Sequence, residues 1–521
     1  MNGEAHHSFR DLMNVMKPEL LPYNQHLDLN EGAGEKSTFL ALPIKRNART
    51  VPNRVVKSLF TQAKEFLEKK DVNHEVKGVN VPDLPSESFT YLDFESALMP
   101  YIAETNAYEN AKAEQILEDH ENQLKLEDYY FEETTMNHKG GHDKPPLVES
   151  NTISKSQWYS MNQLRIHAGC PERSINGIKK LAKYYAQLQY LENKFPFETG
   201  KMKVGFVWYE AWSRLDASSQ TITQCIQYEK ACTLFNVAAT YSQLGAAERL
   251  WSKDGQKKAS SYFQKAAGVL IFIRDSLCQR FQVKLPITSD LNETSLSALS
   301  TFMLAQAAEC YYDKASDVES TSSLTSVIAI YASDLYDVAS RFTKDSTNVL
   351  QQQRFSRDWT QQMKAKYFMF AAIAHFHTGP STNTDRAIAE RLARLSIANR
   401  LITTSVGYAQ EVGGILYQTI LGYAQNFKTA ELCLQTANDA ELHETPYDTR
   451  LLGPLRRPPE ALVNPIAPDS VMEMAEQSAD ILQSLISNDY HLALQDVLTE
   501  SRKVSLAGQL RLKGLIEKYG K

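Results

Sequence analysis

From Trp158 onward, apolar and polar residues alternate with the spacing of helices. Between Asn176 and Phe195 one apolar stripe recurs at every third or fourth position, and its members are Ile178, Leu181, Tyr185, Leu188 and Leu191. This period predicts an amphipathic α-helix. A short aromatic and β-branched run, KVGFVWYEA, follows at 203–211 and predicts an extended segment.

Two longer stretches predict helical hairpins. Residues 228–276 contain two apolar-periodic runs separated by a turn at 252–255, and the second run carries Ala259, Phe263 and Ala266. Small residues around an aromatic are typical of the second helix of a tetratricopeptide unit, where they let two helices approach each other. Another candidate hairpin, at 366–401, lacks exact repeat spacing. The pattern predicts a mainly α protein, an irregular helical solenoid with a tetratricopeptide-like core.

The N-terminal part of the chain is less regular. Residues 1–36 are polar and predict a flexible tail. The run EGAGEKST at its end places Glu35 between a glycine and a lysine, which breaks the spacing that a phosphate-binding loop requires. The run FLALPIKR (Phe39 to Arg46) predicts a short extended element, and 51–67 predicts a helix.

An acidic stretch separates these elements from the helical region. Residues 104–133 contain ten Asp and Glu residues against two lysines, a local charge of -8. We interpret the stretch as a solvated insertion, and the alternative is that it shields a basic face or holds an apolar patch closed. His138 and His142 follow it beside glycines and prolines, with no further Cys or His nearby, so we expect no metal there.

Composition narrows the classes of function. The net charge is -6 and no basic arm is present, so we expect no nucleic-acid partner. The six cysteines are scattered without a CxxC motif, which predicts reduced thiols and no disulfides. No run of about 18 apolar residues occurs, and the first thirty residues lack a signal-peptide core. We expect a soluble protein whose membrane contact, if it has one, is peripheral and with anionic lipids.

No catalytic arrangement stands out. The sequence lacks GxSxG, HExxH and CxxC motifs, and no Ser–His or Cys–His pair has a motif around it. His375 and His377 lie in an apolar helical run and are interpreted as packed or capping residues. We therefore expect no enzyme, no cofactor and no metal. An enzyme whose site forms only in the fold stays open as an alternative, which a pocket of converging titratable groups would favour.

Several blocks in one order carry a family resemblance. They are KYYAQLQYLENKFPF, VGFVWYEA, YEKACTLFNVAATYSQLGAAE, FQKAAGVLIFIRDS and MLAQAAECYYDKA. In order and spacing they resemble the Bro-one domain family, the ESCRT-associated domain of the Alix, Brox and rhophilin type. The resemblance runs from about Trp158 to Thr436, and more weakly includes LALPIKR and residues 444–465. Roughly 115 residues separate LALPIKR from QLRIHAG, more than in the usual pattern, so the acidic stretch looks like an insertion.

The resemblance implies a fold and a domain organisation. It implies a boomerang-shaped helical solenoid with a small N-terminal extended or β element. The expected organisation is a tail at 1–36, a Bro-one-like domain at 37–470 with the acidic insertion at about 70–155, and a C-terminal helical extension at 471–521. Because the chain ends at KYGK, we expect neither the central coiled arms nor the proline-rich tail of Alix-type proteins, and no prenylation box.

The resemblance also implies a partner and a site. In the family, the carboxy-terminal amphipathic helix of an ESCRT-III subunit docks on an apolar patch near the middle of the solenoid, a helix-in-groove mode. The family's motif transfers without a gap and places the patch at Tyr311, Leu324 and Ile328. Leu324 and Ile328 are four residues apart and would face the same way on one helix, and Tyr311 stands where the family commonly has Phe. The alternative is that all three are ordinary core residues.

The function implied is a non-enzymatic scaffold that recruits ESCRT-III in endosomal sorting or membrane remodelling. Its expected location is cytoplasmic, with recruitment to endosomal or other intracellular membranes. A rhophilin-like or pH-signalling adaptor, built on the same domain with another ligand, stays open as an alternative.

Overall fold

The structure is a computed structural model in which the backbone is described for part of the chain. The described residues are 38–47, 98, 153–195, 197, 205–212, 220–281, 285, 289–316, 322–342, 357–379 and 386–483. The tail predicted at 1–36, the helix at 51–67, the acidic stretch at 104–133 and the histidines at 138 and 142 lie outside these residues. The expected domain boundaries stay predictions.

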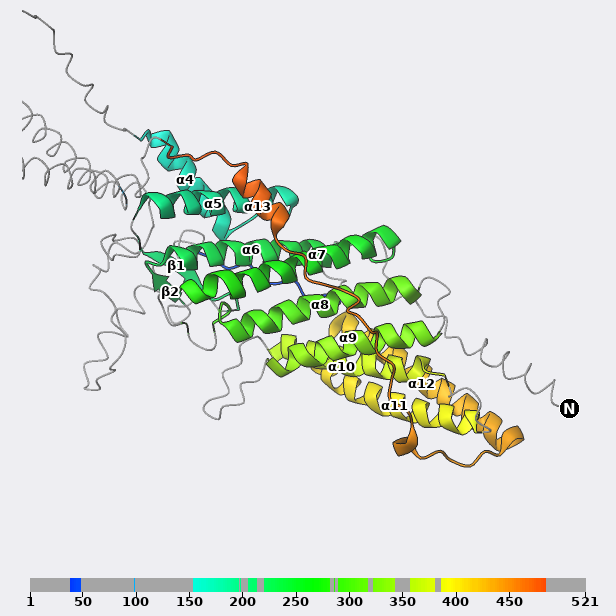
Figure 1. Ribbon diagram of the computed structural model, residues 1–521. Helices are drawn as coiled ribbons and strands as arrows, with labels where there is room; N and C mark the ends of the chain where they lie inside the picture. The colour runs from blue at the N-terminus through cyan, green and yellow to red at the C-terminus, as the bar shows by residue number, and fades with distance from the viewer. Residues whose placement is uncertain are drawn as a thin grey trace, which may run out of the picture.

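The fold is mainly helical, as predicted, with one small sheet (Figure 1). The α-helices are α4 (Lys155–Gly169), α5 (Ile175–Lys194), α6 (Ile226–Ala246), α7 (Lys253–Phe272), α8 (Glu293–Ser316), α9 (Ser322–Phe342), α10 (Arg357–His377), α11 (Ala387–Val412), α12 (Gly414–Ala437) and α13 (Asp469–Glu476). From α4 to α12 each helix packs on the next along the chain, which is the arrangement of a solenoid.

Short helical pieces and the sheet complete the described elements. π-helical turns lie at η3 (Ile273–Leu277) and η5 (Asn438–Leu442), and 3₁₀ turns at η4 (Cys278–Arg280) and η6 (Thr449–Leu451). Strands β1 (Phe206–Tyr209) and β2 (Gln220–Thr223) pair antiparallel, so the extended segment predicted around 203–211 is confirmed. The six cysteines are unpaired.

Local sequence explains where the helices begin and turn. The Ser252 hydroxyl accepts from the Gly255 amide and caps α7, so three residues of the predicted turn at 252–255 are in fact the first turn of the helix. Between α11 and α12 the chain reverses through Gly413 and Gly414, whose φ angles are 72° and 62°. Only glycine adopts this left-handed conformation without strain, which explains the Gly-Gly pair.

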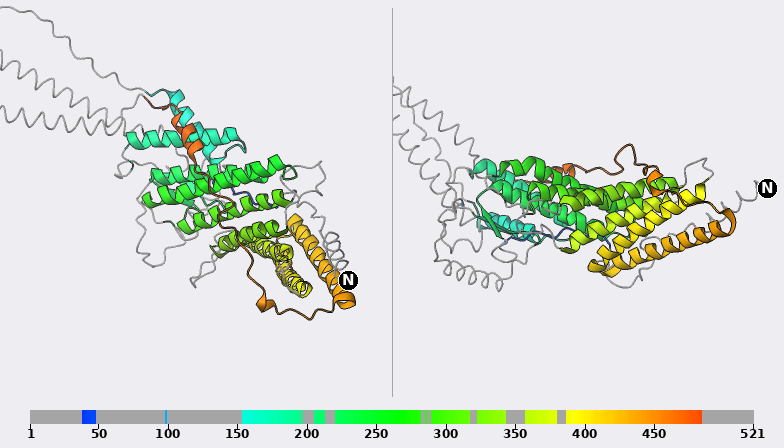
Figure 2. Two further views of the ribbon diagram at one scale, coloured as in Figure 1. Left: turned by 45° about the vertical axis from the view of Figure 1, so that its right-hand side comes forward. Right: turned by 90° about the horizontal axis from the view of Figure 1, so that it is seen from below.

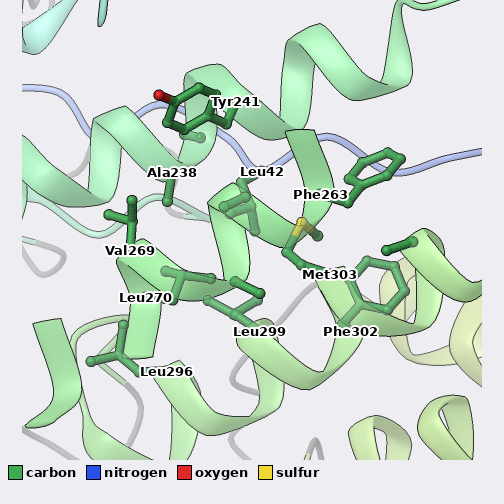
Figure 3. Close-up of a cluster of buried hydrophobic side chains, with 14 of the residues drawn as sticks. Leu42, Ala238, Tyr241, Phe263, Val269, Leu270, Leu296, Leu299, Phe302 and Met303 are labelled. Atoms are coloured by element: carbon green, nitrogen blue, oxygen red, sulfur yellow. The ribbon is translucent and has the colours of Figure 1, made fainter. Parts of the chain in front are cut away.

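Small residues let α6, α7 and α8 pack closely around one aromatic side chain. Phe263 is fully buried, and the ring lies so close to Gly245 that a Cβ there would be 3.1 Å from it. Its neighbours in sequence, Ala259 and Ala266, are also fully buried. The tetratricopeptide-like packing predicted from this spacing is therefore present. Figure 3 shows Phe263 in the core, with side chains from all three helices.

An extended segment at 38–47, which we call the threaded segment, crosses the helices inside the protein. It is the N-terminal element predicted from FLALPIKR. It does not form a strand of the sheet, because it meets the sheet at a single described bridge, between Asn47 and Trp208. Its backbone bonds instead to helix side chains. Gln306 of α8 both donates to and accepts from Leu40, and Ser242 of α6 accepts from the Leu42 amide at 2.8 Å.

The threaded segment is held most firmly at Lys45. Asn236 of α6 accepts from the Lys45 amide at 2.7 Å and donates to the Lys45 carbonyl at 2.8 Å. The Lys45 ammonium is fully buried and donates to both carboxylate oxygens of Asp290, at 2.6 and 2.8 Å. Burial alone would lower the pKa of this ammonium, but Asp290 and Glu210 outweigh it and raise the pKa above its ordinary value.

A second extended segment, residues 443–468, which we call the strap, crosses the opposite face of the array (Figures 1 and 2). Arg394 of α11 donates to the Gly453 carbonyl, Arg457 forms a bidentate ion pair with Asp334 of α9, and the Ile466 amide donates to Gln264 of α7. The strap leads to α13, which packs on α5. It approaches α7 closely, since a Cβ on Gly268 would lie 1.7 Å from the Ile466 carbonyl oxygen.

Replacing Phe263 by alanine removes a ring that is buried on all sides. We expect Phe263→Ala to lower the free energy of unfolding by about 3 to 5 kcal/mol, because a cavity remains between three helices. Chemical denaturation followed by circular dichroism measures this change. Tyr262→Ala, a half-buried neighbour on α7, is the matched control and should cost clearly less. A loss for Phe263→Ala no larger than that of the control would contradict the packing described here.

Removing the Asn236 side chain should loosen the threaded segment. Asn236→Ala leaves the Lys45 amide, the Lys45 carbonyl and the Ala168 carbonyl without the partner they have now. We expect a loss of at least about 3 kcal/mol, since each unpaired buried polar group costs roughly 1 to 3 kcal/mol. Thr240→Val, one turn further along α6 in the core, removes a hydroxyl that bonds back to its own helix and should cost less than about 1 kcal/mol. Equal losses in the two variants would show that the bonds of Asn236 contribute nothing specific.

Candidate helix-binding surface

The described ends of α8 and α9 present apolar side chains to solvent. Tyr311, near the end of α8, is 42% exposed, and Leu324, near the start of α9, is 49% exposed. Their sequence neighbours Tyr312 and Thr325 are buried. In the run MLAQAAECYYDKA the small residues and the second tyrosine therefore pack in the core, and Tyr311 is the residue that reaches the surface.

Ile328, the third residue expected in the patch, is in the core. Its side chain is fully buried, so that position cannot meet a partner helix in this fold. The physical reason is that α9 packs between α8 and α10 and turns its 328 face inward. The residue that shares the outer face with Leu324 is Val327, three positions on, which is half-buried. Both spacings fit one helix face, and only the packing decides between them.

The outer faces of α8 and α9 point to the same side of the array. Gln306 of α8 faces the threaded segment, since it accepts from the Leu40 amide. Tyr336 of α9 faces the same side, since its hydroxyl donates to Glu309 of α8. Glu309 in turn accepts from Lys366, whose ammonium lies 4.8 Å from the Phe39 ring centroid. At 100° per residue, Tyr311 and Val327 lie roughly opposite these inward residues, so both face away from the threaded segment.

The strap limits this surface on one side. The hydroxyl of Tyr331, one turn beyond Val327 on α9, donates to the Val463 carbonyl of the strap at 3.3 Å. From there the strap continues toward α7. Apolar residues therefore remain accessible between the strap and the ends of α8 and α9. We call this region the α8–α9 surface and define it by Tyr311, Ala315, Leu324 and Val327, of which Ala315 is half-buried.

Three ion pairs of the described residues are buried and therefore not accessible to a substrate. Each lies in a closed ion pair in the core: Lys45–Asp290, Arg165–Glu229 and Lys366–Glu309, with side chains at most 2% exposed. Glu229 also accepts from the Tyr184 hydroxyl and the Trp208 indole. Among the described residues, no three His, Cys, Asp or Glu side chains are grouped for a metal ion. None of the described helices combines the length and apolarity needed to cross a bilayer.

Comparison with known proteins identifies the family. The profile of the BRO1-like domain matches residues 149–504, well over half of the chain. The chain belongs to the BRO1-like domain family. This membership agrees with the resemblance drawn from the sequence blocks, and it accounts for the helical solenoid that the structure shows.

The relatives at the sequence level are longer proteins. Mouse "Tyrosine-protein phosphatase non-receptor type 23" is 27% identical over 370 residues, which cover 68% of this chain and 21% of that protein. "Apoptosis-linked gene 2-interacting protein X 1" of Caenorhabditis elegans is 28% identical over 66% of this chain and 38% of its own length. "pH-response regulator protein palA/prr-1" of Neurospora crassa is 32% identical over 49% of this chain and 29% of its own length. The chain thus spans between a fifth and two fifths of these relatives.

Solved structures share the fold at low identity. The "ALIX BRO1 CHMP4C complex" matches 63% of this chain and 88% of that one, with a TM-score of 0.54 and 22% identity. The structure titled "Structure basis for endosomal targeting by the Bro1 domain" matches 64% of this chain and 87% of that one, with a TM-score of 0.51 and 17% identity. These matches establish the solenoid of the BRO1-like domain for this chain.

His375 and His377 lie near the end of α10 against arginines of the next helix. Burial lowers the pKa of His377 to about 4, and the neighbouring Arg391 adds to the shift. Burial likewise lowers the pKa of His375 to about 4, with contributions from Arg394 and Arg400. His377 is 9% exposed, in agreement with the interpretation of a packed residue.

The shifted histidines make stability depend on pH in a defined window. In the unfolded chain each imidazole takes up a proton below about pH 6.5, whereas the folded protein takes it up only near pH 4, so stability should fall as the pH drops from 6.5 to 4. His377→Gln removes one of these groups and should reduce that loss by up to about 3 kcal/mol at pH 4. Denaturant unfolding across this window measures the slope. His443→Asn changes an exposed histidine and is the control. A wild-type slope in His377→Gln would contradict the effect.

Proposed function

We propose that this chain is a non-enzymatic ESCRT-associated adaptor whose α8–α9 surface binds the carboxy-terminal amphipathic helix of an ESCRT-III subunit. In this role it acts in endosomal sorting or membrane remodelling, in the cytoplasm and at endosomal or other intracellular membranes. Two features support the proposal together. The chain belongs to a family with a solved relative titled "ALIX BRO1 CHMP4C complex", and it exposes Tyr311 near the end of α8 and Leu324 near the start of α9, two helices that pack on each other.

The chemistry of the surface suits a helix. An amphipathic helix presents apolar side chains at a spacing of three and four residues, and it binds where a few of them enter an apolar groove. Leu324 and Val327 form one side of such a site on α9, and Tyr311 forms the other on α8. The Tyr311 ring supplies a flat apolar face and keeps its hydroxyl at the edge, where water satisfies it. Large residues at the centre of such a contact carry most of the binding energy.

A charge at the centre of the α8–α9 surface should abolish most of the binding. We expect Leu324→Asp to weaken binding of the ESCRT-III helix at least about tenfold, because the carboxylate would have to be desolvated against an apolar partner. The wild type and the variant are titrated with labelled peptides of ESCRT-III carboxy-terminal helices, and anisotropy gives the affinity. Both proteins should have the same circular dichroism spectrum, since Leu324 is already half in solvent.

Val338→Asp is the matched control for this experiment. Val338 lies on the same helix and is 42% exposed, but it stands beyond the point where Tyr331 meets the strap. We expect its affinity to equal that of the wild type. If Leu324→Asp binds as tightly as the wild type, or if Val338→Asp weakens binding as much, the helix does not use the α8–α9 surface. If the wild type binds no ESCRT-III helix, an adaptor with another ligand, such as a pH-signalling adaptor, replaces this proposal.

A further inference from the structure

One tryptophan stands apart from the others. Trp251, in the turn between α6 and α7, is 49% exposed, whereas Trp158, Trp208 and Trp359 are buried and Trp212 is half-buried. Between residues 223 and 310 it is the only described large apolar side chain that is exposed. An indole that is half exposed at the end of a helical hairpin contributes little to the core, so its position calls for another explanation.

The turn holds the Trp251 backbone in place. Leu250 is buried, and its carbonyl accepts from the Gln256 side chain at 2.9 Å. The Ser252 amide donates to the Arg249 carbonyl at 3.1 Å, so the residues on both sides of Trp251 are bonded. Gly255 permits this turn, since a Cβ there would lie 2.0 Å from the Arg249 carbonyl oxygen. The indole is therefore presented by a fixed backbone.

Basic residues flank the exposed indole in the sequence. The guanidinium of Arg249 lies 5.9 Å from the Trp251 ring centroid, and three exposed lysines follow at the start of α7: Lys253, Lys257 and Lys258. The acidic residues in the same stretch are Glu248 and Asp254, and Asp254 pairs with Lys258 at 2.7 Å. From Glu248 to Lys258 the net charge is +2, in a chain whose total is -6.

We propose that the α6–α7 turn is a membrane contact, in which Trp251 enters the interface of an anionic phospholipid bilayer and the surrounding Arg and Lys side chains meet its headgroups. Indole rings favour the bilayer interface because they combine an apolar body with one polar N–H. Cations beside it are attracted by the negative surface potential of anionic lipids. A protein partner fits less well, because a binding hot spot is ringed by further contacts and this turn exposes no second large apolar side chain.

The position of the turn is suited to this role. The carboxyl ends of α6 and α8 lie at the same edge of the array, as do the starts of α7 and α9 (Figures 1 and 2). A bilayer held at the α6–α7 turn would therefore lie along the edge from which Tyr311 and Leu324 are reached. The membrane contact goes beyond the proposed function and does not depend on it, since it uses different residues and a different ligand.

Intrinsic fluorescence tests the contact directly, because one tryptophan is exposed. The full chain is mixed with vesicles of phosphatidylcholine alone or of equal parts phosphatidylcholine and phosphatidylserine. With the anionic vesicles we expect the emission to shift to shorter wavelength and to be quenched by brominated acyl chains. The difference spectrum between the wild type and Trp251→Ala assigns the signal to Trp251. We expect Trp251→Ala to weaken vesicle binding about tenfold, and Trp251→Phe to retain part of it.

Two further variants separate the causes. Lys257→Gln removes one exposed cation and should reduce both the affinity for anionic vesicles and its dependence on salt. Tyr159→Ala removes an aromatic of α4 that is 66% exposed, and it should leave vesicle binding unchanged. In solution without lipid, Trp251→Ala should bind the ESCRT-III helix as the wild type does, and Leu324→Asp should bind vesicles as the wild type does.

The proposal fails under any of three results. Vesicle affinity of Trp251→Ala equal to that of the wild type would remove the role of the indole. An emission spectrum of Trp251 that does not change on adding anionic vesicles would show that the ring stays in water. A loss of helix binding by Trp251→Ala in the absence of lipid would place the turn in a protein-binding surface. Each of these readings is independent of whether Leu324→Asp affects the helix titration.

Discussion

The structure depends on pairing the backbone of a buried extended segment that has a strand beside it only at its Asn47 end. An extended chain inside a protein needs a partner for each amide and carbonyl, and a sheet normally supplies them. Here polar side chains of the helices do so instead, with Gln362 at Thr38, Gln306 at Leu40 and Asn236 at Lys45. These side chains are buried, and their positions fix the register of the threaded segment along the array.

The two extended segments divide the helices between them. The threaded segment bonds to α10, α8 and α6 and reaches α4 through Asn47, whose side-chain Nδ2 donates to the Arg165 carbonyl. The strap and the chain that follows it bond to α11, α9, α7 and α5 on the other face. In a solenoid each helix contacts chiefly its sequence neighbours, so long-range ties are scarce. The segments supply them: the threaded segment joins α10, α8, α6 and α4, and the strap with the chain after it joins α11, α9, α7 and α5 and also meets α4, where Gln157 donates to the Ile481 carbonyl.

The hydrophobic periodicity of the sequence predicts most of the fold but less of the candidate site. The stripe of α5, the hairpin around Phe263 and the extended runs at 39–46 and 203–211 are local patterns, and the structure contains them. The family's motif, transferred without a gap, places Ile328 in the patch, and its spacing of four residues from Leu324 is consistent with that. A face of a helix can turn inward or outward, however, and only the packing of α9 between α8 and α10 decides. A single sequence contains nothing that would show that Val327, and not Ile328, faces outward.

Polar residues in the core were missed for a related reason. Gln306 stands in the run MLAQAAE, where it looks like an exposed position, yet it is fully buried and bonds to a residue 266 positions away. Lys45 and Asp290 are paired over 245 positions. The sequence around each of these residues does not indicate its partner, because the need for a partner arises only when a distant segment packs across the helix. A buried charge of this kind is stable only with its partner, so the ion pairs also specify which segments must meet.

The same ties explain why the accessible apolar surface is small and where it lies. Each helix of a solenoid has a face that its neighbours leave uncovered, and an apolar face left open over the whole length would favour aggregation. The threaded segment covers one side of α6 and α8, and the strap crosses α9 at Tyr331 before it reaches α7 at Gln264. On α8 and α9 the stretch between the strap and the helix ends stays open, with Tyr311 and Leu324, and Val338 of α9 is exposed on the other side of the strap. The proposed partner helix would therefore approach at this edge of the array, because the strap crosses α9 further along.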